Sequence, residues 1–129
     1  MTSRISRHTT AALYAVSAGI VKPAAELAEC AATAQRRGWE VGCRAEFWDS
    51  APQGRLVARA EWDRAMKRAE AGVVAGIVAH RLADVVPDAE AHARLEGWAV
   101  DQNTFVLFVD GGPYGPLHLV GRAPAGVIA

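Results

Sequence analysis

The sequence predicts a three-layer α/β protein, in which a mainly parallel sheet of about four strands carries helices on both faces. Short apolar segments alternate along the chain with longer segments rich in Ala, Glu, Leu and Arg, which are good helix formers. Two of the apolar segments, Val73 to Ala79 and Phe105 to Val109, are uninterrupted, as is typical of strands covered on both faces. This alternation favours parallel strands joined by right-handed helical crossovers.

The first half of the chain contains two predicted strands and one helix. Ala11 to Val16 is short and apolar and leads into Ser17, so it is expected to be a strand. Pro23 to Arg37 has a proline suited to a first helical turn and Gly38 suited to the position after the last turn, which predicts a helix. Trp39 to Trp48 alternates apolar and polar residues, which predicts a half-buried second strand with Val41, Cys43, Ala45 and Phe47 on one face.

The second half repeats the pattern after a loop. Ser50 to Val57 contains Pro52 and Gly54 and has no helical period, so it is expected to be an irregular loop. Arg59 to Ala71 has apolar residues spaced for one helical face. Pro87 to Glu96 is expected to be a third helix that stops at Gly97.

The length of 129 residues fits one domain. We expect residues 1–10 to be a disordered start and residues 11–110 to form the folded domain. Residues 111–129 are rich in Gly and Pro and are expected to be a tail. For Leu117 to Val120 the alternatives are a short edge strand and an irregular segment.

The composition excludes several classes of protein. Lys plus Arg and Asp plus Glu both number 14, so no overall positive field would hold DNA without a local patch. Cys30 and Cys43 form no metal-binding spacing, and both are expected to be buried thiols in a reducing cytoplasm.

Charges interrupt every apolar run before the ~20 residues of a membrane span, so no membrane association is expected. We expect no cofactor and no metal, because His92 and His118 lie too far apart in the sequence to indicate a site.

Several segments, read in order, resemble the catalytic domain of the serine recombinases, the resolvase and invertase family. The resemblance extends over most of the chain, and it depends on the order and spacing of its parts. The matching segments are Tyr14-Ala15-Val16-Ser17, Trp39-Glu40-Val41, Asp49, Arg59-Ala60-Glu61-Trp62, Arg81-Leu82 and Phe105 to Asp110.

This resemblance implies phosphoryl transfer on DNA, in which a serine hydroxyl attacks a backbone phosphate and forms a phosphoserine intermediate. Ser17 falls on the nucleophile of the family. Arg59 falls on the arginine that opens the helix after the mobile loop, and Arg81 on the arginine of the Asp-Arg-Leu motif. Arginine suits this chemistry because its planar, permanently charged fork binds the oxygens of a phosphoryl group.

Three positions depart from the family pattern. Ala15 stands where the family has an arginine two residues before its serine, His80 stands for the acid of the motif, and Asp84 replaces a further arginine. Losing one preorganised donor typically costs ~3 to 4 kcal/mol of transition-state stabilisation. We therefore expect strand cleavage to be weak or lost. The chain ends at Ala129, before the long helix and DNA-reading domain of the family, so DNA contact is expected through a partner protein, in a homodimer or hetero-oligomer.

Each candidate also has a structural interpretation. Ser17 suits a strand-to-helix turn, Arg59 a solvated helix start, and Arg81 a salt bridge with Asp84 or Asp49. His80 suits a proton shuttle beside Ser17 or an inert hydrogen-bonded histidine. The alternative functions are accordingly a non-catalytic interaction module that kept the recombinase fold, and a small-molecule phosphate-binding domain that uses the carboxyl edge of the sheet.

Overall fold

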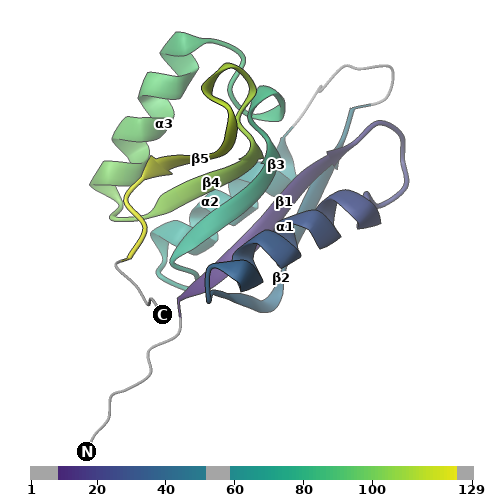
Figure 1. The fold of residues 1–129 in the computed structure, drawn as a ribbon, viewed down its shortest axis with the longest axis horizontal. Coiled ribbons are helices and arrows are strands. Elements are labelled where there is room, and N and C mark those ends of the chain that lie inside the picture. The colour runs from purple at the N-terminus through teal and green to yellow at the C-terminus, as the bar shows by residue number, and fades with distance from the viewer. Residues whose placement is uncertain (1–8, 52–58, 125–129) are drawn as a thin grey trace, which may run out of the picture.

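A computed structural model of the chain describes residues 9–51 and 59–124, which form a five-stranded sheet with the order β2-β1-β3-β4-β5 (Figure 1). The first four strands are parallel, and β5 is antiparallel to β4. The elements are β1 (Thr10–Ser17), α1 (Ala24–Arg36), β2 (Glu40–Ser50), α2 (Ala60–Glu70), β3 (Gly76–Arg81), the short 3-10 helix η2 (Leu82–Asp84), α3 (Ala89–Asp101), β4 (Phe105–Asp110), the 3-10 helix η3 (Gly112–Tyr114) and β5 (Pro116–Gly121).

Two apolar layers enclose the sheet, as the sequence predicted. On one face α1 packs over β1 and β3, and Leu27, Cys30 and Ala34 of the helix contact Leu13 and other strand residues. On the other face α2 and α3 pack against the alternate residues of the same strands. Figure 1 shows α1 on the near side of the sheet, where it packs mainly over β1 and β3 and also reaches β4. The α/β class and the three layers are therefore confirmed.

The strand order reverses between β1 and β3. The chain leaves β1 through α1 toward β2 at one side of the sheet, whereas it leaves β3 through α3 toward β4 at the other side. Where connections diverge in this way, a crevice forms outside the carboxyl ends of the two central strands, and ligands of open α/β sheets bind there. The edge formed by Ser17 and by His80 with Arg81 is that point.

The sheet has five strands where about four were expected, because the segment Leu117 to Val120 is part of β5. Backbone pairing runs from Phe105 opposite Gly121 to Asp110 opposite Pro116. Of the expected disordered start, Thr10 already belongs to β1, and residues 1–8 lie outside the described residues. Most of the expected loop at 50–57 also lies outside them, as does the end of the tail at 125–129.

The third helix continues through Gly97 to Asp101, so the predicted stop at Gly97 is wrong. A glycine inside a helix costs only about 1 kcal/mol, and the extra turn buries Ala99 in the core. The helix ends instead at Asp101, and Asn103, two residues later, has a φ of 55° that reverses the chain. The backbone N–H of Thr104 then donates to the carbonyl of Ala99 over 2.9 Å, which satisfies one of the last helical carbonyls.

The predicted alternation of β2 is broken by a bulge. Ala11 pairs with Val41 whereas Leu13 pairs with Glu46, so β2 has extra residues between these pairs, and Arg44 there has a φ of 53°. A bulge changes which face the following residues occupy. Cys43 is consequently exposed, not buried as expected, while Cys30 is buried.

No helix within the described part of the chain is both long enough and apolar enough to cross a membrane.

Candidate functional site at the carboxyl edge of the sheet

Ser17 is the last residue of β1 and is 7% exposed. Its Oγ accepts a hydrogen bond from the backbone N–H of Gly19 over 3.1 Å, which tightens the turn toward α1. Its neighbour across the sheet is Ser50, the last residue of β2. Because side chains alternate along a strand and Ala15 packs on the α1 side, Ser17 belongs to the α1 face.

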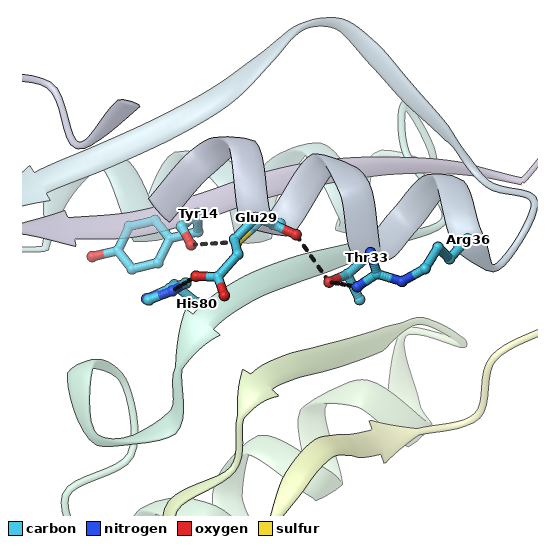
Figure 2. Close-up of polar contacts among 6 residues, drawn as sticks. Tyr14, Glu29, Thr33, Arg36 and His80 are labelled. Atoms are coloured by element: carbon cyan, nitrogen blue, oxygen red, sulfur yellow. Dashed lines mark hydrogen bonds and ion pairs between the residues drawn. The ribbon is translucent and has the colours of Figure 1, made fainter. Parts of the chain in front are cut away.

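His80 lies on the same face, on the neighbouring strand. Val78 packs on the α1 side, so His80 does as well, and its Nε2 lies 2.6 Å from Oε1 of Glu29 on α1. Figure 2 shows the His80 ring meeting the Glu29 carboxylate where α1 crosses β3. A carboxylate at this distance orients the ring. Ser17 and His80 therefore share one side of the carboxyl edge.

Arg81 belongs to the other side. Ala79 packs against the α2 and α3 side of the sheet, and the pleat places Arg81 on that side too, where it is exposed at the end of β3. Its backbone partner on β4 is Asp110. Within the described residues Arg81 makes no ion pair with Asp84 or Asp49, although its charge acts on Asp84 at longer range.

Arg59 is the residue before α2 and is fixed by a backbone contact. Its Nη1 donates to the carbonyl oxygen of Val85 over 2.6 Å, a bond that joins the start of α2 to the segment after η2. Val85 packs on the α2 and α3 side, so Arg59 and Arg81 lie on the same side of the sheet. Among the described residues, Val85 is the hydrogen-bond partner of the Arg59 guanidinium.

Asp49 is the organising residue of this edge, and its role was not recognised in the sequence. Oδ1 accepts from the backbone N–H of Glu61 over 3.1 Å, and Oδ2 accepts from that of Trp62 over 3.1 Å. The hydroxyl of Tyr14 donates to Oδ2 over 2.7 Å. The carboxylate thus caps α2 from a different strand, because the residue at the usual capping position, Arg59, has no acceptor.

The charges at this edge perturb one another. Burial, and then the hydrogen bond to Asp49, raise the pKa of Tyr14 far above its ordinary value, so the phenol stays a proton donor. Burial also raises the pKa of Asp84, and nearby Asp110 adds to the rise, whereas Arg81 and His80 oppose it. Asp84 therefore lies within electrostatic reach of the cations that an anion would use.

The structure brings the three predicted residues to one edge of the sheet, at the point where the strand order reverses. It distributes them over two sides, with Ser17 and His80 facing α1 and the two arginines facing α2 and α3. Within residues 9–51 and 59–124 no hydrogen bond or ion pair joins Ser17 to Arg59 or Arg81. The same residues contain no group of three or more His, Cys, Asp or Glu side chains arranged as metal ligands.

Comparison of the chain with known protein families, with curated proteins and with solved structures found no match.

Proposed function

We propose that this chain is a resolvase-like DNA strand-transfer domain with weak or residual activity. The observation that supports this most directly is the position of Ser17, Arg59 and Arg81 at the carboxyl edge where the strand order reverses. A crevice between diverging connections admits a ligand. A hydroxyl and two permanent cations beside it are groups that can bind the phosphodiester of a DNA backbone. The resemblance of the segments around these residues to serine recombinases supplies the reaction type.

In the proposed step, Ser17 Oγ attacks a backbone phosphorus atom. The new bond is Oγ to phosphorus, the bond from phosphorus to one strand end breaks, and that end leaves as a hydroxyl that receives the proton of Ser17. Arg59 and Arg81 lie on the other side of the sheet edge from Ser17, so the proposed step requires the phosphate to span this edge, where the arginines meet the other oxygens, whose charge grows in the transition state. His80, on the same face as Ser17 and oriented by Glu29, is the group proposed to carry the proton.

Low turnover follows from the composition of the edge. Ala15 provides no cation next to Ser17, and Asp84 adds a carboxylate within reach of Arg81. A carboxylate at this position repels the phosphate that the arginines attract. The proposed partners are therefore a DNA-binding protein that supplies the missing cations and a second copy of the chain or a related subunit, in the cytoplasm.

The test uses supercoiled plasmid DNA, with the purified chain and two serine variants. The expected result is a low yield of nicked DNA carrying covalently attached protein, which Ser17→Ala abolishes. Ser50→Ala is the matched control, because Ser50 is the residue paired with Ser17 at the end of the next strand. Nicking that survives Ser17→Ala, or that Ser50→Ala removes equally, would contradict the proposed nucleophile.

A second candidate is a non-catalytic module that associates through the sheet, and one observation favours it. On the α1 side, α1 reaches β4 but no helix in the described part of the chain packs over β5, and Leu117 and Leu119 are exposed there. Leu119 pairs with the fully buried Leu107, so the apolar core extends to this open surface. A second copy of the chain would bury it, since large exposed apolar residues that continue a core mark interaction sites.

Analytical ultracentrifugation tests this second candidate, because it measures whether the chain is a monomer or a dimer. If the surface is a homodimer interface, Leu119→Glu gives a monomer, whereas Val100→Glu leaves the dimer intact, because Val100 is an equally apolar but isolated exposed residue on α3. A wild-type chain that is monomeric at all concentrations would overturn it.

A further inference from the structure

Two histidines far apart in the sequence meet between the last helix and the last strand. His92 lies on α3 and is buried, and His118 lies on β5 and is half-buried. Their Nε2 atoms are 2.9 Å apart. Within the described residues this is the side-chain hydrogen bond between α3 and β5, so it joins the final strand to the body of the domain.

The two rings meet head to head. Their centroids are 5.2 Å apart. This separation equals the distance between the two Nε2 atoms plus the distance from centroid to Nε2 within each ring. Both nitrogens therefore lie close to the line joining the ring centres, and an N–H of one ring points at the lone pair of the other. A metal ion bound by both rings would need the two lone pairs to converge on a third point, which this geometry does not provide.

The surroundings of the pair are tightly built. Tyr114 of η3 stacks on both rings, with centroids 4.6 Å from His92 and 4.4 Å from His118. A Cβ on Gly111 would lie 2.5 Å from the Cβ of His118, so only glycine fits under this ring. The start of β5 is strained as well, because Leu117, its second residue, has a φ of 56°. The segment needs specific contacts to stay in this conformation.

Within the described residues, Glu96 and Asp110 are the charged groups to consider beside the pair. On α3, Oε1 of Glu96 lies 3.8 Å from Nδ1 of His92. From the end of β4, Asp110 accepts the backbone N–H of Gly112 over 2.9 Å and is engaged in the turn. Tyr114 contributes a neutral ring. The pair can thus hold one extra proton without losing its hydrogen bond.

We propose that the His92 and His118 pair is a proton-operated clasp, which holds η3 and β5 against α3 until both Nε2 atoms carry a proton. With no or one positive charge, one ring donates and the other accepts. When both Nε2 atoms are protonated, two donors and two positive charges face each other at 2.9 Å, and the contact must open.

The direction of the pH response follows from the same contacts. Burial first, and then the neighbouring His92, lower the pKa of His118, while Glu96 opposes them. A histidine whose pKa is lower in the closed state than in the open state stabilises the closed state above its ordinary pKa, near ~6.5. That contribution is lost as the pH falls below this value. The clasp is therefore closed at neutral pH and opens in mild acid.

Opening would reach the candidate site, although the inference does not depend on the proposed function. η3 follows β4 directly, and Asp110 at the end of β4 pairs with Arg81. Gly112 lies beside Leu82, the residue after Arg81. Release of η3 and β5 would therefore loosen one wall of the carboxyl edge.

The test measures amide hydrogen exchange of β5 in the full chain between pH 7.5 and 5, corrected for the intrinsic exchange rate. The opening constant of β5 is expected to rise about tenfold per pH unit below ~6.5, since opening takes up one additional proton. His118→Gln and His92→Gln keep a polar amide but cannot titrate, and each is expected to flatten this slope. His80→Gln is the matched control and should preserve it, because His80 lies on the opposite face of the sheet.

An unchanged slope in both glutamine variants, or no slope in the wild-type chain, would overturn the proposal. If the variants do not fold, the proposal is tested on the wild-type chain by following the imidazole nitrogen NMR signals of His92 and His118 as a function of pH. A shared hydrogen bond gives two separated apparent pKa values, one of them below the ordinary histidine value. Two independent titrations near ~6.5 would refute the clasp.

Discussion

Asp49 shows how one side chain can determine the arrangement of three elements. It lies next to the last residue of β2, caps α2 and accepts a hydrogen bond from the hydroxyl of Tyr14 on β1. Each of these groups is buried or half-buried, so water cannot replace the carboxylate easily. In the sequence, Asp49 is only one of the segments that resemble serine recombinases. Its contacts in the structure explain why an acid is needed at this position.

Asp49→Ala is predicted to lower the free energy of unfolding by about 2 to 4 kcal/mol, because it removes a cap and leaves a buried phenol without its acceptor. Urea denaturation followed by tryptophan fluorescence measures the change. Asp88→Ala is the control, since Asp88 caps α3 through a single exposed bond to Ala91, and it should cost about 1 kcal/mol. Equal losses in the two variants would mean that the contacts of Asp49 with Tyr14 contribute nothing.

At the scale of elements, two glycines inside regular secondary structure have opposite roles. Gly76 opens β3, and a Cβ there would lie 2.5 Å from the buried ring of Phe105. Gly97 lies inside α3, and nothing is within 4 Å of the position of its Cβ. The first is required by packing between β3 and β4, and the second only weakens a helix.

Gly76→Ala is therefore predicted to destabilise the protein by about 1 to 3 kcal/mol through overpacking. Gly97→Ala is predicted to stabilise it by up to about 1 kcal/mol, through helix propensity and a smaller loss of backbone entropy. Thermal unfolding of the two variants in parallel gives the sign of each effect. Destabilisation by Gly97→Ala would contradict the open space around Gly97 and would show that another group contacts α3 at this position.

At the scale of the whole molecule, the position of charge matters more than its total. Fourteen basic and fourteen acidic residues cancel over the chain, yet the carboxyl edge has Arg59 and Arg81 beside Asp84. Phosphate binding depends on the local field, because screening limits each charge to about a Debye length.

Asp84→Arg changes the charge of this edge by two and is predicted to strengthen DNA binding and to steepen its salt dependence by about 0.9 per added phosphate contact. Fluorescence anisotropy of a labelled duplex at several salt concentrations measures both quantities. Asp101→Arg makes the same charge change at the end of α3, at the opposite edge of the sheet, and should have a smaller effect. Equal strengthening by the two variants would indicate non-specific attraction and would count against a site at the carboxyl edge.

The sequence by itself determined the α/β class, the order of the elements through β4 and the placement of Ser17 and Arg81 at strand ends, because apolar period and capping residues are local properties of the chain. Only the tertiary structure decided what depends on distant segments meeting. It set the bulge in β2, the extension of α3 past Gly97, the pairing of β5 and the division of the candidate residues between two faces. The head-to-head histidines belong to the same group, since 26 residues separate them and no local pattern encodes which strand a helix will cover.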